Sequence, residues 1–228
     1  MRISLPSGTE AELAMPVGEP TRGLVLAPDI MGLRPLFDDL CAQLAHENGW
    51  AVLAPEPFPG RESMTLEERM AAVGGLEDDV QVGALTEAAD HLTAMGVAPN
   101  AVLGFCMGGM YALKASSAGP SGKGQPRPFD KVVAFYGMIR VPERWQSDTQ
   151  GAPLDFVTAS GAAPVLAIIG TADPFTPPDD VDALEATGAT VVRYEGAEHG
   201  FVHDASRPSH RPDDAADAWH RVREFLAT

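Results

Sequence analysis

The stretch AVLGFCMGGMYALKA, residues 101–115, places a cysteine between two glycines where two apolar segments meet. Residues 101–104 form a short apolar run, which predicts a buried β-strand. Residues 110–115 are typical of a helix. The order is therefore strand, abrupt turn and helix, with Cys106 at the turn, and this order predicts an α/β protein.

Gly104, Cys106 and Gly108 fit the pattern G-x-S-x-G with cysteine in place of serine. In that pattern the nucleophile lies at a strained turn, and the glycines let neighbouring segments approach closely. A following helix also favours the thiolate, the reactive form of cysteine. We therefore interpret Cys106 as a nucleophile. The alternative is a buried, inert cysteine in a tight strand-to-helix turn.

Further short apolar runs alternate along the chain with segments of helical period. The other predicted strands are residues 24–27, 51–54, 131–135, 165–169 and 190–194. The predicted helical stripes are Leu36, Leu40 and Leu44; then Leu85, Ala88, Leu92 and Met95; then Ala215, Trp219, Val222 and Leu226. Because most of the strands are apolar on both faces, we expect a mostly parallel, doubly wound sheet covered by helices on both sides. We find no linker or repeat, so residues 1–228 are predicted to form one domain.

An acid and a histidine follow the cysteine in the order that the nucleophile motif requires. Asp173 comes after the predicted strand 165–169, and His199 comes after 190–194. We expect His199 to take the thiol proton and Asp173 to orient the imidazole. The alternatives are that Asp173 is a turn residue before Pro174 and that His199 belongs to a surface loop.

The tetrahedral intermediate of such a reaction needs hydrogen-bond donors for its oxyanion. One predicted donor is the backbone N–H of Met107, directly after the nucleophile. The other is the N–H of Ile30, in the loop after the strand 24–27. The alternative is that residues 29–32 only form the turn into the next helix.

These segments resemble the dienelactone hydrolase family over nearly the whole chain. The segments that match, in the order of the family, are LVLAPDIMGL, GWAVLAPEPFPG, GFCMGG, GTADPFTPP and EHGF. The resemblance implies a three-layer α/β-hydrolase fold and a metal-free triad, here Cys106, His199 and Asp173. It also implies that an unsaturated lactone is opened through an acyl-thioenzyme to give an oxo-acid.

The resemblance assigns roles to further positions. The family commonly has a glutamate that holds the resting thiol, and its place is taken here by Asp29, whose side chain is one methylene shorter. Family members also use arginines to hold a substrate carboxylate. The segment after His199 offers His203 and then Arg207, and Arg69 lies where an upstream arginine is expected. The alternative for Arg69 and Arg207 is an ordinary solvated surface.

Composition limits the partners of the protein. The net charge of −16 argues against binding nucleic acid or an anionic membrane, because basic patches supply that affinity. No apolar run approaches a membrane span, and the N-terminus lacks the apolar core of a secretion signal, so we expect a cytoplasmic protein. No Cys/His cluster has the spacing of zinc ligands, and we expect neither a metal nor another cofactor. The oligomeric state stays open.

The sequence therefore predicts a cysteine hydrolase that opens a small ester or lactone. Two alternatives remain. One is a general carboxylesterase, and the other is a non-catalytic ligand-binding or thiol-sensing protein on a hydrolase scaffold.

Overall fold

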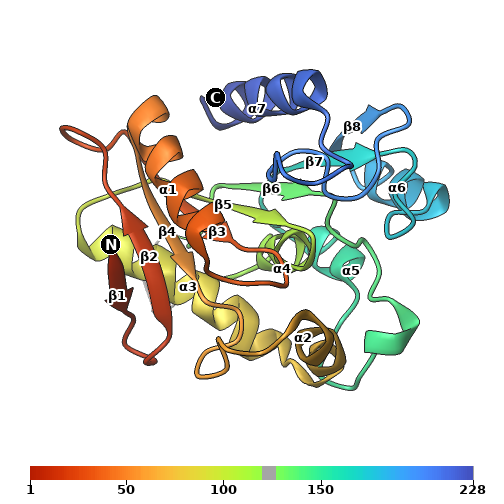
Figure 1. Cartoon of the computed structure of the whole chain (residues 1–228), viewed down its shortest axis with the longest axis horizontal. Helices are drawn as coiled ribbons and strands as arrows, with labels where there is room; N and C mark the ends of the chain where they lie inside the picture. Colours follow the sequence, from red (N-terminus) through yellow and green to blue (C-terminus); the bar gives the residue numbers. More distant parts are fainter. Residues whose placement is uncertain (120–126, 228) are drawn as a thin grey trace.

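The computed structural model describes residues 1–119 and 127–227, which form an eight-stranded sheet with helices on both faces (Figure 1). The strands are β1 (Arg2–Ser4), β2 (Glu10–Ala14), β3 (Arg22–Ala27), β4 (Trp50–Pro55), β5 (Asn100–Phe105), β6 (Lys131–Phe135), β7 (Val165–Gly170) and β8 (Thr190–Tyr194). Their order in the sheet is β1-β2-β4-β3-β5-β6-β7-β8. Strands β3 to β8 are parallel, and β1 and β2 are antiparallel additions at one edge. The prediction of a mostly parallel sheet is confirmed.

The helices form two outer layers. On one face lie α1 (Pro35–Asn48) and α7 (Pro212–Ala227), and on the other lie α3 (Asp78–Ala94), α4 (Met107–Ala115) and α6 (Pro178–Glu185) (Figure 1). The shorter elements are α2 (Leu66–Ala72), α5 (Pro153–Val157) and the 3₁₀ turns η1 (Val73–Gly75) and η2 (Glu143–Trp145). Each face of the sheet packs its own hydrophobic core against its helix layer.

Strand β5 shows why the sequence favours this arrangement. Ala101, Leu103 and Phe105 point into the core on the side of α1 and α7, and Val102 points into the core on the other side. All of these side chains are buried. A strand buried on both faces reads as a continuous apolar run rather than an alternating one, which is what residues 101–105 are.

The six predicted strands all occur, but β1 and β2 were not predicted. Both lie at the antiparallel edge, where charged residues interrupt any apolar run, as in the segment EAELA of β2. The predicted stripe of α1 is displaced by one residue, because Phe37, Cys41 and Leu44 are buried whereas Leu36 and Leu40 are only half-buried. Met95 is 43% exposed, because α3 ends at Ala94 and its stripe ends there too.

The parallel sheet determines where a site can form. The loops after β3, β5, β7 and β8 all leave the sheet at its carboxyl edge. They bring together the segments that begin with Pro28, Cys106, Thr171 and Glu195. Ligands of open α/β sheets bind at this edge.

Candidate active site

Cys106 lies at the corner between β5 and α4, as the motif predicts. Its backbone has φ 56° and ψ −117°, and it is one of two non-glycine residues with positive φ in the described part of the chain. Such a conformation costs on the order of 1–3 kcal/mol and persists only where the surroundings enforce it. The thiol is free and half-buried. The strain therefore lies at the residue that is predicted to react.

The glycines around Cys106 are required by close backbone contacts. A Cβ on Gly104 would lie 2.1 Å from the carbonyl oxygen of Gly108, and a Cβ on Gly108 would lie 2.2 Å from the carbonyl oxygen of Ala27. A Cβ on Gly109 would lie 2.9 Å from the Cα of Gly137. These contacts press the first turn of α4 against the ends of β3 and β6. They therefore explain the glycine spacing on both sides of the cysteine.

His199 and Asp173 meet at the same edge. The Nδ1 of His199 lies 2.7 Å from Oδ2 of Asp173, whose Oδ1 accepts a hydrogen bond from the Phe175 N–H at 2.9 Å. The Asp173 carboxylate is fully buried, and the His199 side chain is 16% exposed. An ionised acceptor at Nδ1 requires a proton on that nitrogen. The pair therefore leaves Nε2 as the nitrogen available for reaction.

The Nε2 of His199 is buried and has no hydrogen-bond partner among the described residues. Burial disfavours the charged ring, but its interactions with Asp173 and with the Cys106 sulfur outweigh burial and raise the pKa of His199 to about 10. The rings of Tyr136 and Phe175 contact His199 edge-on, with centroids 5.1 and 4.9 Å away. The surroundings thus favour a protonated imidazole beside the sulfur.

Two backbone amides near the elbow are available to an oxyanion. Met107 is the first residue of α4, so its N–H has no partner inside the helix. Nothing in the described part of the chain accepts a hydrogen bond from the Ile30 N–H. The carbonyl oxygens of Ala27 and Pro28, just before Ile30 in sequence, lie against Gly108. Both candidate donors therefore belong to segments that pack against each other.

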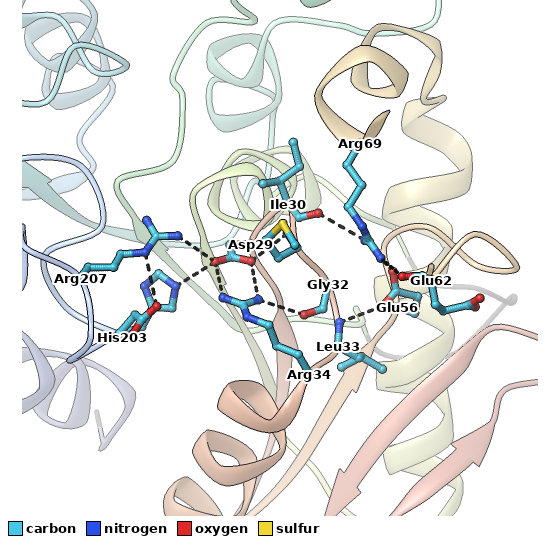
Figure 2. A network of polar contacts seen from close by, with 12 residues as sticks. Asp29, Ile30, Gly32, Leu33, Arg34, Glu56, Glu62, Arg69, His203 and Arg207 are labelled. Atoms are coloured by element: carbon cyan, nitrogen blue, oxygen red, sulfur yellow. Dashed lines mark hydrogen bonds and ion pairs between the residues drawn. The ribbon is translucent and has the colours of Figure 1, made fainter. Parts of the chain in front are cut away.

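Asp29, expected from the resemblance to hold the thiol, lies in an ionic cluster (Figure 2). Its carboxylate accepts a bidentate pair of hydrogen bonds from Arg34 at 2.7 and 2.8 Å, and one from the Met31 N–H at 2.9 Å. The Nε2 of His203 lies 3.0 Å from Oδ2. Among the described residues, no hydrogen bond joins Asp29 to Cys106. In this conformation the carboxylate is therefore occupied by the cluster and not by the thiol.

Arg69, expected either to hold a substrate carboxylate or to lie on the surface, is 2% exposed. Its Nη1 donates to Glu56 at 3.1 Å and to the Ile30 carbonyl at 3.3 Å, and its Nη2 donates to the Glu62 carbonyl (Figure 2). Its Nε donates to the Met64 carbonyl. The surface expectation is wrong, because the buried Glu56 carboxylate requires a buried cation. Arg69 has no exposed guanidinium edge to offer a substrate.

Arg207 keeps an accessible guanidinium. It is 36% exposed and lies 3.7 Å from Asp29 and 3.5 Å from Asp204. A Cβ on Gly200 would lie 2.6 Å from its Nη1, so the guanidinium rests against the residue directly after His199. Of the two predicted arginines, Arg207 is therefore the one that the fold leaves beside the triad.

Tyr136 was missed by sequence reasoning. It follows β6 with φ 40°, it is fully buried, and its hydroxyl is hydrogen-bonded to Nδ1 of His203. Burial and the negative charges of Cys106 and Asp29 raise its pKa well above the usual value. The one available signal was a tyrosine at the carboxyl end of the strand next to β5. Nothing in the sequence indicates a left-handed backbone at a tyrosine.

In the part of the chain that the structure describes, no three or more His, Cys, Asp or Glu side chains gather in a way that could hold a metal ion. None of the described helices is both long and apolar enough to span a bilayer.

Comparison with known proteins places the chain in a family. The model of the dienelactone hydrolase family matches residues 9–228. A carboxymethylenebutenolidase from Rhodococcus opacus is 30% identical over 218 residues, which cover 89% of this chain and 79% of the relative. A probable 2-oxo-3-(5-oxofuran-2-ylidene)propanoate lactonase from Bradyrhizobium sp. is 29% identical over 217 residues, 89% of this chain and 82% of the relative.

A crystal structure agrees with these matches. The putative dienelactone hydrolase from Klebsiella pneumoniae subsp. pneumoniae MGH 78578 superposes with a TM-score of 0.85 and 25% identity, over 100% of this chain and 98% of that one. The agreement covers the whole sheet and both helix layers. The chain therefore belongs to the dienelactone hydrolase family, has an α/β-hydrolase fold and is a hydrolase.

Proposed function

We propose that this hydrolase opens a small ester or lactone through an acyl-thioenzyme on Cys106. The observation that carries the proposal is the placement of His199, which is paired with Asp173 through Nδ1, whose Nε2 has no other partner among the described residues, and whose pKa is raised in part by the Cys106 sulfur. Relatives named as carboxymethylenebutenolidase and as a lactonase support a lactone as one substrate class.

In the first half of the proposed reaction, His199 holds the proton of the Cys106 thiol. The thiolate attacks the carbonyl carbon, and the N–H groups of Ile30 and Met107 bind the oxyanion that forms. When the intermediate collapses, the bond from carbon to the leaving oxygen breaks, and His199 gives its proton to that oxygen. In a lactone the released hydroxyl stays attached to the acyl group.

In the second half, a water molecule attacks the thioester. His199 takes a proton from the water, the carbon–sulfur bond breaks, and Cys106 leaves as the thiolate beside the imidazolium. The product is a carboxylic acid, and the enzyme has returned to its starting state. Asp173 keeps the same tautomer of His199 through both halves, because its carboxylate holds the Nδ1 proton throughout.

The carboxylesterase alternative is favoured by one observation. The family resemblance implies an arginine shortly after His199, but the first candidate there is the buried His203, and Arg69 is enclosed by its own partners. Burial, the largest influence on His203, and the nearby arginine charges lower its pKa despite its contact with Asp29, so the ring is uncharged at neutral pH. Arg207 is then the candidate contact for a substrate carboxylate. Values of kcat/KM for a panel of neutral and carboxylate-bearing esters and lactones distinguish a lactonase that prefers carboxylate-bearing substrates from a general carboxylesterase.

The acyl-thioenzyme is tested by quenching turnover of a slowly deacylated ester in acid and analysing the peptides by mass spectrometry. We expect the acyl mass on the peptide that contains Cys106, and no turnover by Cys106→Ala. Cys41→Ala, at the other cysteine, is the matched control and is expected to form the adduct. Turnover by Cys106→Ala, or an adduct elsewhere, would contradict the mechanism. A wild-type protein that is inactive on the whole panel would support the ligand-binding alternative.

A further inference from the structure

The loop between β3 and α1 is fixed by polar contacts on two sides (Figure 2). On one side, the Asp29 carboxylate bonds to Arg34 and His203. On the other side, Arg69 donates to the Ile30 carbonyl, and Glu56 accepts from the Leu33 N–H at 2.8 Å. Most of these groups are buried, so few of the contacts compete with solvent. The loop that carries the Ile30 N–H is thus held at several points.

His203 is the contact that comes from the far end of the chain. Its side chain is fully buried, and Phe105 stacks on the ring with centroids 4.7 Å apart. One ring nitrogen meets Asp29 and the other meets Tyr136, so both polar atoms of the imidazole have partners. A buried histidine that is held by two hydrogen bonds and a stacked ring has a single orientation. It can therefore fix the position of the β3–α1 loop relative to the loop that carries His199.

The protons of this chain of contacts can be assigned. Burial alone would raise the pKa of Asp29, but its hydrogen bonds and charge interactions with His203 and Arg34 outweigh burial and hold it far below the ordinary value. Asp29 is therefore a carboxylate, and the uncharged His203 must donate to it from Nε2. Nδ1 is then an acceptor for the Tyr136 hydroxyl, which stays protonated because its pKa is raised. The Nε2–H of His203 and the hydroxyl of Tyr136 therefore each have an acceptor.

We propose that His203 is a positioning residue whose Nε2–H···Asp29 hydrogen bond sets the spacing between the general base and the oxyanion site. His203 lies four residues after His199 on the same segment, and Asp29 directly precedes Ile30. The bond therefore ties together two loops that are 174 residues apart in sequence. The inference rests on the proposed function, in which His199 and the Ile30 N–H act on one substrate.

The backbone around Asp29 links the position of its carboxylate to the direction of the Ile30 N–H. Oδ1 of Asp29 accepts from the Met31 N–H, and its own carbonyl accepts from the Gly32 N–H at 2.9 Å. The Asp29 carbonyl and the Ile30 N–H belong to one planar peptide and point in opposite directions. A carbonyl held by Gly32 therefore aims the Ile30 N–H the other way. Because an oxyanion donor must lie within about 3 Å of its target, a displacement of about 1 Å costs on the order of 100-fold in rate.

Two substitutions at His203 separate its two hydrogen bonds. In His203→Gln the amide nitrogen reaches about as far as Nε2, so the bond to Asp29 is kept. In His203→Asn the amide oxygen takes the place of Nδ1, so the bond to Tyr136 is kept and the bond to Asp29 is lost. Both variants leave a polar side chain of similar burial. His46→Asn, on the exposed side of α1, is the matched control.

Two rates report on different parts of the site. Acylation by an activated ester forms an oxyanion, whereas alkylation of Cys106 by iodoacetamide forms none. We expect His203→Asn to lower kcat at least tenfold with KM within about threefold, and to leave the alkylation rate unchanged. His203→Gln is expected to restore most of kcat. The Ile30 N–H stabilises the oxyanion mainly in the transition state, so its displacement is expected to lower kcat and to leave KM nearly unchanged.

Three outcomes would overturn the inference: equal losses in the Gln and Asn variants, no loss in either, or a parallel loss of alkylation. A wild-type enzyme that is alkylated at Cys106 but turns over no ester would instead contradict the proposed function. Nitrogen-15 NMR of the imidazoles gives a test that does not depend on how the variants fold. We expect His203 of the wild-type protein to be the neutral Nε2–H tautomer at pH 7, and an Nδ1–H tautomer or an imidazolium would overturn the inference.

Discussion

Gly108 lies so close to the end of β3 that a Cβ on it would come within 2.2 Å of the Ala27 carbonyl oxygen and 2.3 Å of that of Pro28. Both neighbours are backbone atoms, which cannot turn aside as a side chain can. The contact packs the first turn of α4 against the start of the loop that carries Ile30. The nucleophile and one candidate oxyanion donor are therefore placed by the same glycine.

Gly108→Ala is expected to lower the free energy of unfolding by about 3 kcal/mol or more, because the added methyl forces α4 away from β3. Gly83→Ala is the matched control. Gly83 lies inside α3 with nothing within 4 Å of its Cβ position, so alanine there should raise stability by up to about 1 kcal/mol. Urea unfolding of the three proteins measures both effects. A Gly108→Ala protein as stable as the wild type would show that the elbow is less tightly packed than the structure implies.

The two cysteines are expected to differ strongly in reactivity. Cys41 is fully buried in α1, where burial, with further help from the charges of Glu12 and Asp38, raises the pKa of its thiol to about 12. Cys106 is half-buried and lies beside His199. Iodoacetamide at pH 7.5, followed by peptide mass spectrometry, should label Cys106 at least 100-fold faster, because the thiolate is the reactive form. Equal and slow labelling of both cysteines would contradict an accessible elbow.

The protonation of His199 predicts an alkaline limit for activity. As pH rises through about 10, His199 loses the proton that it would give to the leaving oxygen. We therefore expect kcat/KM for an alkyl ester to fall near pH 10. A p-nitrophenyl ester should fall less, because its leaving group departs without a proton. Profiles of the two esters between pH 6 and 11, with circular dichroism to follow the fold, measure this difference. Parallel profiles, or a fall centred near pH 6.5, would contradict the assignment.

The same proton contributes to stability. The pKa of His199 is raised from 6.5 in the absence of interactions to about 10 in the folded protein. The stabilisation is therefore complete below about pH 6.5 and is lost as pH rises toward 10. His199→Gln should lack this contribution, so the difference in the free energy of unfolding between the wild type and this variant should shrink as pH rises from about 6.5 toward 10, as urea unfolding at several pH values measures.

The sequence was sufficient to predict the parallel sheet and the meeting of Asp173 with His199. Each depends on a local pattern, a buried strand followed by a polar residue, and parallel strands carry such residues to the same edge. It was not sufficient to predict the edge strands β1 and β2, because their pairing with β4 depends on long-range contacts and not on their own pattern. Arg69 and Tyr136 could not be placed for a related reason. The burial of Arg69 is explained by Glu56, thirteen residues away in sequence, and the contacts of Tyr136 come from His203.

Arg207 gives the last prediction, which concerns substrate charge. Its guanidinium is partly exposed and rests against Gly200, next to His199, where the carboxylate of a bound substrate would gain a charge-assisted hydrogen bond. Arg207→Gln is expected to raise KM about tenfold for a carboxylate-bearing ester and to leave KM for its neutral methyl-ester analogue within about twofold. Arg221→Gln, on the exposed face of α7 where Arg221 pairs with Asp217, removes the same charge from a residue that the site does not use and should change neither value. Equal effects of Arg207→Gln on the two esters would show that Arg207 acts through Asp29 and the loop, and not on the substrate, because only a direct contact distinguishes a charged acyl group from a neutral one.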